Sequence, residues 1–98
     1  MTVEQLTAEE RDSWLSGLKG WALTREGKAI QRTFEFGDFS EAFAFMTRVA
    51  MIAEARDHHP EWFNVYKTVK VTLTTHDAGG LSELDVKMAK AMDKIAAA

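Results

Sequence analysis

Apolar residues recur with helical spacing in three segments of the chain, and each segment follows a polar residue that can cap a helix. In the first segment Thr7 and Glu10 match a capping box, and Gly20 offers a stop beyond the apolar positions. In the last segment Ser82 and Asp85 repeat the capping pattern after a Gly-Gly pair that marks a loop. The apolar stripe of this last helix consists of Leu84, Met88, Met92 and Ile95. These patterns predict a helix near each end of the chain.

The middle helix has the widest apolar surface. Asp38 and Glu41 favour its start, and it is expected to end near Arg56 or Asp57 because Pro60 disfavours helical backbone in the residue before it. Its apolar positions form two adjacent stripes, one of Phe39, Phe43, Met46, Ala50 and Ala53, the other of Ala42, Phe45, Val49 and Ile52. Such an arc is wider than a single-sided amphipathic helix needs. It predicts burial on two sides, one of them a candidate contact with another subunit.

Strand-like segments lie between the helices. Residues 21–24 and 29–36 flank a Gly-containing hairpin loop at 25–28, residues 62–66 are short and aromatic, and residues 69–76 alternate apolar with polar. The resulting order is helix, two strands, helix, two strands, helix. It predicts one α+β domain over residues 1–98, with a four-stranded antiparallel sheet and three helices on one face.

Composition narrows the possible partners and the cellular setting. The 98 residues suffice for one domain with a modest core, so self-association is expected. With 12 Lys and Arg against 15 Asp and Glu, no basic patch favours nucleic acid. The most apolar stretch, residues 42–53, is too short to span a membrane, and the polar amino terminus has no signal-peptide pattern. The absence of cysteine excludes disulfides and thiolate chemistry, and a reducing, cytoplasmic location is expected.

The candidate chemistry is concentrated in three histidines. His58 and His59 follow the middle helix directly, and His76 is expected to close the last strand on its polar face. Two carboxylates lie close in sequence: Glu54, one helical turn before His58, and Asp57. Histidine exchanges protons near neutral pH, and a neighbouring carboxylate can fix its tautomer. Two such sets brought together could supply a general acid and a general base in one pocket.

Other interpretations remain open on these residues alone. Histidines are often structural or solvated, Asp85 has a sufficient role as a capping residue, and Trp21 is of a type usually found in a core or interface. Three histidines could also hold zinc. However, His58 and His59 would point to opposite sides of an extended chain, and the spaced helical pair of zinc proteases is absent.

A longer pattern contains these residues. Residues 54–66 read EARDHHPEWFNVY, and they are followed by residues 69–73, by Thr75-His76, by Gly80-Leu81-Ser82 and by Asp85. This arrangement resembles the pterin-4a-carbinolamine dehydratase family, in which an acidic residue, His-His-Pro, an aromatic residue, a later His and an Asp recur in this order. The resemblance extends through nearly the whole chain.

The resemblance implies a fold, an assembly and a reaction. The fold is the predicted one, and family members associate through sheet edges into dimers and often through the middle helix into tetramers. The reaction eliminates water from a 4a-hydroxytetrahydropterin to give a quinonoid dihydropterin, which supports tetrahydropterin recycling. An acid must protonate the departing hydroxyl and a base must accept the N5 proton. No electrons move, so neither a redox cofactor nor a metal is required.

The same resemblance implies roles for individual residues. His58 and His76 correspond to the proton donors beside the 4a-carbon, and His59 to a pterin-contacting proton acceptor. Three carboxylates would orient imidazoles or pocket groups, and a tryptophan could form an aromatic wall; these residues are Glu54, Asp57, Asp85 and Trp21. The expected small-molecule partner is a pterin.

A second function from a different class stays open. Some animal members of the family also stabilise the dimer of a homeodomain transcription factor through a helical surface. A third possibility is a regulatory or assembly factor with a vestigial pocket. The three intact histidines argue against a vestigial site, and the chain has no basic cluster typical of nuclear localisation.

Overall fold

Residues 3–98, which the computed structural model describes, form the predicted succession of elements. These are α1 (Ala8–Leu15), β1 (Ala22–Thr24), β2 (Ala29–Glu35), α2 (Phe39–Arg56), β3 (Glu61–Val65), β4 (Thr68–Leu73), the short 3-10 helix η1 (His76–Ala78) and α3 (Glu83–Ala97). The predicted capping boxes at Thr7 and Ser82 are both present, and Asp38 accepts from the Glu41 amide at the start of α2. The sequence signals for helix starts are therefore confirmed.

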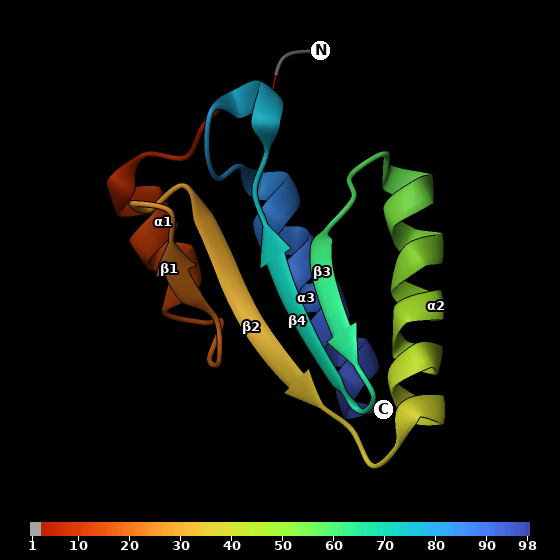
Figure 1. Cartoon of the computed structure of the whole chain (residues 1–98). Helices are drawn as coiled ribbons and strands as arrows, with labels where there is room; N and C mark the ends of the chain where they lie inside the picture. The colour runs from red at the N-terminus through yellow and green to blue at the C-terminus, as the bar shows by residue number, and fades with distance from the viewer. Residues whose placement is uncertain (1–2) are drawn as a thin grey trace.

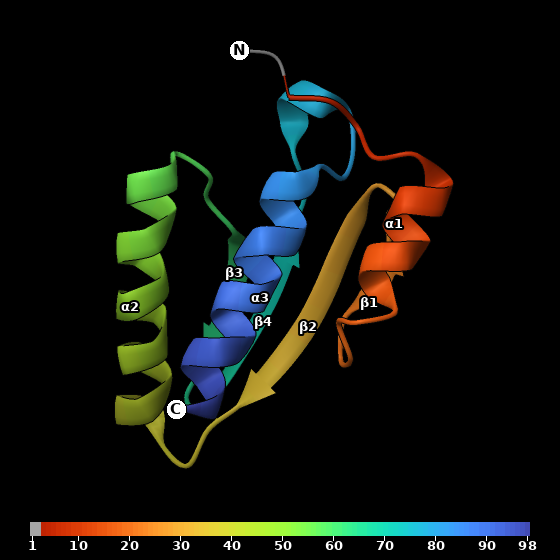
Figure 2. The ribbon, with the colours of Figure 1, turned by 180° about the vertical axis from the view of Figure 1, so that it is seen from behind.

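The four strands form one antiparallel sheet in the order β1-β2-β4-β3 (Figure 1). The register between the central strands pairs Ile30 with Leu73 and Phe34 with Val69. These four side chains are buried, as the predicted alternation requires. Seen from behind, the helices lie on one face of this sheet, with α3 over its middle and running along the strands (Figure 2). The predicted fold class is confirmed.

The core side of α2 takes most of one predicted apolar stripe and the carboxyl-terminal end of the other. The buried residues of α2 are Ala42, Phe45, Val49 and Ala53. By contrast, Phe39 and Phe43 are 45% and 55% exposed, and their rings contact each other at 5.5 Å between centroids. The wide apolar arc thus divides into a side that faces the core and an outward stripe, which consists of Phe39, Phe43 and Met51. No helix in the described part of the chain is long and apolar enough to cross a membrane.

The last strand ends earlier than the alternation predicted. β4 stops at Leu73, and Thr75 instead forms an isolated bridge with Gly80, with its amide 2.9 Å from the Gly80 carbonyl. The chain between them turns through η1 and through Gly79, whose φ is 75°. The prediction that His76 closes the last strand is therefore wrong, because the backbone hydrogen bonds of this segment go to its own turn.

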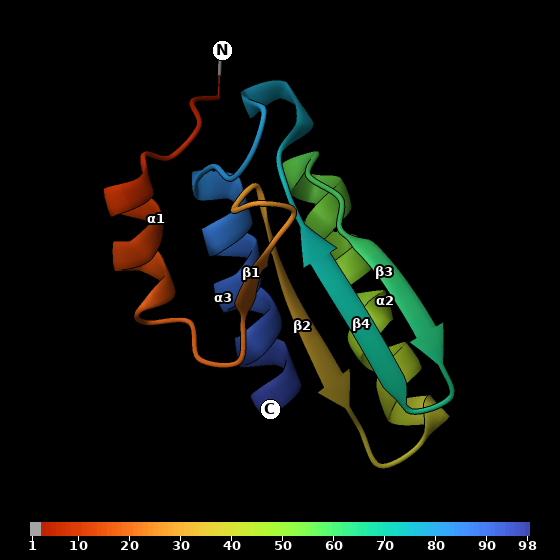
Figure 3. The ribbon, with the colours of Figure 1, turned by 60° about the vertical axis from the view of Figure 1, so that its left-hand side comes forward.

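Three structural features relevant to chemistry meet at one end of the sheet. The carboxyl end of α2, the turn η1 and the start of α3 all lie at the end away from the chain's carboxyl terminus (Figure 1). In the side view the amino-terminal segment also reaches this end (Figure 3). The amide of Leu6 donates to the carbonyl of Leu81 at 2.8 Å, which fixes that segment beside α3. The predicted site residues, apart from Trp21, come from these elements and the turns beside them.

Candidate active site

The end of α2 turns His58 into the protein. Asp57 adopts the left-handed conformation, with φ 50° and ψ 42°, and its amide donates to the carbonyls of Ala53 and Glu54. The His58 amide donates to Ala53 at 3.0 Å, so the chain reverses over the last helical turn. Glycine is the usual residue at such a reversal because it has no Cβ. In this protein an aspartate occupies the position. The reversal directs the chain so that His58 is buried, with a relative exposure of 8%.

We expect Asp57→Gly to raise the free energy of unfolding by roughly 0.5–1 kcal/mol, because glycine adopts the left-handed conformation without strain. Asp57→Asn tolerates the same backbone and removes only the charge, so it is the matched control. Urea denaturation of the three proteins measures the effect. Loss of stability in the glycine variant would mean that the Asp57 side chain itself stabilises the turn. If Asp57 orients an imidazole, both variants should also slow turnover.

The central feature of the site is a buried imidazole–carboxylate pair. The Nε2 atom of His58 lies 2.6 Å from the Oδ1 atom of Asp85, which has no exposed surface. The other carboxylate oxygen accepts from the Thr75 hydroxyl at 2.7 Å and from the Ser82 amide at 3.0 Å. A buried charge is costly unless it is paired and hydrogen-bonded, and both carboxylate oxygens here have partners. Asp85 therefore serves the helix cap and His58 together.

The other two histidines are exposed. His59 Nε2 lies 2.8 Å from Glu54 Oε1, so Glu54 pairs with His59 and not with His58, its neighbour by helical spacing. The reversal at Asp57 explains the difference, because His58 no longer continues the helix. His76 begins η1, is fully exposed, and has Nδ1 3.6 Å from its neighbour Asp77. Across residues 3–98, no three His, Asp or Glu side chains lie close enough together to hold a metal ion.

Trp21 lies away from the histidines, in the hydrophobic core. Its indole N–H donates to both carboxylate oxygens of Asp93, at 2.9 and 3.1 Å, and Arg32 binds the same carboxylate at 2.7 Å. Asp93 follows Asp85 by eight residues on α3, which is about 12 Å along the helix axis. The structure thus does not bring Trp21 to the imidazole–carboxylate pair, and its role as a pocket wall stays a prediction.

An ion pair fixes the start of β3 just after the His-His-Pro turn. Both guanidinium nitrogens of Arg25 bind the Glu61 carboxylate, with Nη1 2.9 Å from Oε2. The hydrogen bond from Arg25 lowers the pKa of Glu61; burial opposes this shift, and the positive charge of Arg25 adds a smaller lowering. Both side chains are about half exposed, so the pair contributes orientation more than stability.

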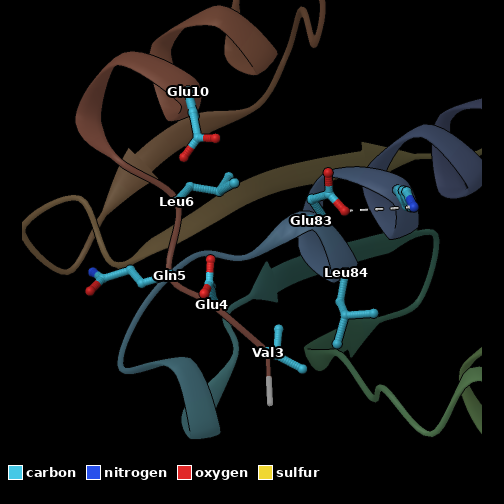
Figure 4. A pocket seen from close by; sticks show the side chains of 8 residues that line it. Val3, Glu4, Gln5, Leu6, Glu10, Glu83 and Leu84 are labelled. Carbon is cyan, nitrogen blue, oxygen red and sulfur yellow. Dashed lines mark ion pairs between the residues drawn. The ribbon is translucent and has the colours of Figure 1, made fainter. Parts of the chain in front are cut away.

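A cavity of about 580 Å³ lies between the amino-terminal segment and the start of α3 (Figure 4). The polar groups that line it are mainly the carboxylates of Glu4, Glu10 and Glu83. The Nζ atom of Lys87 lies 3.9 Å from Glu83 Oε2. Gly80 lies under Gln5, whose side-chain nitrogen would be 2.6 Å from an added Cβ. None of the three histidines lines this cavity. The cavity therefore lies at the same end of the sheet as the histidines without including their imidazoles.

Two buried hydroxyl groups belong to the site in addition to the residues that the sequence predicted. The hydroxyl groups of Thr75 and Ser82 lie 2.6 Å apart, and both are buried against Asp85. The sequence places Ser82 at a helix cap and both residues in the longer family pattern, but it assigns neither hydroxyl a role in the site. A hydroxyl at an inward strand position is the signal that could have identified Thr75, because a buried hydroxyl requires a partner.

A four-stranded antiparallel sheet with helices on one face, and with a carboxylate-paired histidine buried at one end, defines a small α+β protein of a recognisable class. A family model described as pterin 4 alpha carbinolamine dehydratase matches residues 4–95. The chain belongs to the pterin-4-alpha-carbinolamine dehydratase family.

Individual relatives agree with this assignment. The chain is 65% identical over 96 residues to a protein of Bradyrhizobium sp. (strain ORS 278) named "Putative pterin-4-alpha-carbinolamine dehydratase", covering 98% of this chain and 96% of that one. A relative of the same name from Novosphingobium aromaticivorans is 62% identical over 93 residues, with 95% and 97% covered.

Two solved structures have the same fold. The crystal structure of a transcriptional coactivator/pterin dehydratase from Brucella melitensis matches with a TM-score of 0.92 and 50% identity, covering 95% of this chain and 99% of that one. A pterin dehydratase-like protein described as a RuBisCO assembly factor in the alpha-carboxysome matches with a TM-score of 0.69 and 26% identity, covering 79% and 89%.

Proposed function

We propose that this protein dehydrates a 4a-hydroxytetrahydropterin to the quinonoid dihydropterin and so supports tetrahydropterin recycling. The observation that carries the proposal is the buried pair of His58 with Asp85, in a chain that belongs to a dehydratase family. A histidine held by a carboxylate at hydrogen-bond distance is suited to general acid–base catalysis. The reaction requires a general acid and a general base, and an imidazole can serve as either.

The chemistry divides into two proton movements. One imidazolium protonates the 4a-hydroxyl while the C4a–O bond breaks, so the hydroxyl leaves as water. A base removes the proton from N5, and the electron pair of that N–H bond forms the C4a=N5 double bond. One proton is given and one is taken, so no oxidant or reductant is needed. Solvent then returns both protein groups to their starting charge.

We assign the acid role to His58 and His76 and the base and pterin-contacting role to His59. His58 is buried, which suits a proton donor that must keep a fixed position. His59 and His76 are exposed and therefore accessible to a substrate. Glu54 supports His59 at 2.8 Å and Asp85 supports His58 at 2.6 Å. Each carboxylate can stabilise the charged form of its imidazole.

The outward stripe of α2 favours a second candidate function, binding of another protein. Phe39, Phe43 and Met51 expose 45%, 55% and 71% of their surface on one helix, which is unusual for large apolar side chains. A second copy of this chain, giving a homodimer or homotetramer, is the occupant we propose. A regulatory partner is the alternative, since two related proteins are described as a transcriptional coactivator/pterin dehydratase and as a RuBisCO assembly factor. We place the protein in the cytoplasm, without a nucleic-acid or membrane partner.

A direct assay tests the enzymatic proposal. We expect the purified protein to accelerate the decay of 4a-hydroxytetrahydropterin, followed by its ultraviolet absorbance, above the rate without protein. Because the proposed steps use imidazoles alone, the acceleration should survive exhaustive treatment with a chelator. Heat-denatured protein at the same concentration is the control. An activity that disappears with the chelator and returns with added zinc would contradict the histidine mechanism, and no acceleration at all would favour the binding function.

A further inference from the structure

Two hydroxyl groups lie behind the pair of Asp85 and His58, on the side away from the imidazole. The Thr75 hydroxyl oxygen is 2.7 Å from Asp85 Oδ2 and 2.6 Å from the Ser82 hydroxyl oxygen. Thr75 is 5% exposed, and Ser82 and Asp85 are not exposed at all. The four residues form a buried hydrogen-bond chain from Ser82 through Thr75 and Asp85 to His58. The proton transfers proposed above assign no role to either hydroxyl.

The direction of donation along this chain follows from counting protons. A carboxylate only accepts hydrogen bonds, so the proton between Thr75 and Asp85 belongs to Thr75. Threonine has one hydroxyl proton, so the proton between the two hydroxyls belongs to Ser82. The Ser82 oxygen in turn accepts from the Leu84 amide at 3.2 Å, and the Ser82 amide donates to Asp85. All donation on this side therefore runs toward Asp85.

We propose that Thr75 and Ser82 are positioning residues that hold Asp85 as a pure acceptor and thereby fix the tautomer of His58. Since Asp85 Oδ1 offers no proton, His58 Nε2 carries one, and Nδ1 is the ring nitrogen left to exchange protons with the pterin. A single atom then donates when the ring is charged and accepts when it is neutral. This assignment rests on the proposed function for its effect on turnover, but the tautomer itself does not.

The chain can be broken at Thr75 with almost no change in shape. Thr75→Val removes the hydroxyl from a near-isosteric side chain, and Thr75→Ser restores it. Thr72→Val is the matched control, because the Thr72 hydroxyl lies on β4 and accepts from Gln31 at 3.0 Å, outside the hydrogen-bond chain to Asp85. In ¹⁵N-labelled protein, the ring-nitrogen chemical shifts of His58 report which nitrogen carries the proton. We expect one fixed tautomer in the wild type, in Thr75→Ser and in Thr72→Val, and a mixture in Thr75→Val.

Turnover should follow the tautomer. Loss of one hydrogen bond to a charged group predicts that Thr75→Val dehydrates about 10–100-fold more slowly, with most of the rate returning in Thr75→Ser. Should Thr75→Val fail to fold, Ser82→Gly tests the same chain, because glycine keeps most of the helix cap while removing the first hydroxyl. It is expected to shift the tautomer in the same direction.

An unchanged His58 tautomer in folded Thr75→Val and Ser82→Gly would overturn the proposal. So would a changed tautomer with unchanged turnover, which would leave the hydroxyls a purely structural role. If the wild type does not dehydrate the pterin, the proposed function fails, and the ring-nitrogen shifts still test the chain by themselves. The two failures are therefore distinguishable.

Discussion

Replacing His58 with glutamine should leave a folded protein that dehydrates its substrate about 10²–10⁴-fold more slowly, the usual loss when a positioned proton donor is removed. Glutamine can still donate an amide N–H to Asp85, 2.6 Å from the present ring nitrogen, but it cannot exchange a proton at neutral pH. His58→Ala should be equally slow and also less stable, by about 1–3 kcal/mol, because it leaves a buried carboxylate oxygen without its partner. Turnover per folded molecule and thermal denaturation on the same preparations separate the two effects.

His76 provides the comparison that makes this test specific. It is fully exposed, so His76→Ala should leave stability unchanged, and any loss of turnover reports chemistry alone. His59→Ala should likewise slow turnover with little effect on folding. The double change at positions 58 and 76 should be slower than either single change, though by less than the product of their effects if the residues act together. Full turnover in a folded double variant would remove both histidines from the mechanism.

Phe45→Asp should unfold the chain, whereas Phe43→Asp should leave it folded. Phe45 is 3% exposed, and its ring lies 4.8 Å from that of Phe34 and 5.0 Å from that of Phe36 between centroids. Removing a buried phenylalanine side chain costs about 3–5 kcal/mol before any charge is buried. That is a large part of the total stability of about 5–15 kcal/mol typical of a domain. Circular dichroism against temperature measures the outcome.

The same pair of variants tests the assembly. Phe43 is 55% exposed on the outward stripe, so its replacement leaves the core intact. If that stripe is the contact between copies, light scattering should show at least a dimer for the wild type at micromolar concentration and a smaller species for Phe43→Asp. Phe45 and Val49 lie in the core, so replacing either of them cannot separate assembly from folding. An unaltered assembly in folded Phe43→Asp would mean that the copies meet elsewhere.

The sequence was sufficient for the fold because its local signals agree with one another. Capping residues, alternating strands and a glycine-containing hairpin all predict the same order of elements, and the structure has that order. The end of a strand was predicted wrongly where the alternation of apolar and polar residues conflicted with a turn signal. At Leu73 the alternation continues to His76, but Gly79 and Gly80 allow the chain to turn back, and the backbone bonds of Thr75 follow the turn.

The partners of the histidines could be predicted only in part. Helical spacing predicted that Glu54 would lie next to His58. Asp57 has left-handed backbone and redirects the chain, so Glu54 contacts His59 instead. Asp85 was recognised through the resemblance and meets the Ser82 amide through the predicted capping box, whereas Thr75 reaches both residues only through the turn at η1. Contacts that depend on one backbone reversal are not visible in residue periodicity, because periodicity describes regular elements.

The Asp85 side chain contributes both to the stability of the helix start and to the position of His58, two properties that protein engineers usually adjust separately. The Oδ1 atom contacts the His58 imidazole, and the Oδ2 atom accepts from the amide of Ser82, the residue that caps the start of α3. A mutational survey scored by protein abundance would class Asp85 as structural, and one scored by turnover would class it as catalytic. Neither score alone would be informative at this position. A library meant to make the protein more heat-resistant should therefore keep this residue fixed and vary the exposed capping residues Thr7 and Asp38, which have no contact with an imidazole to lose.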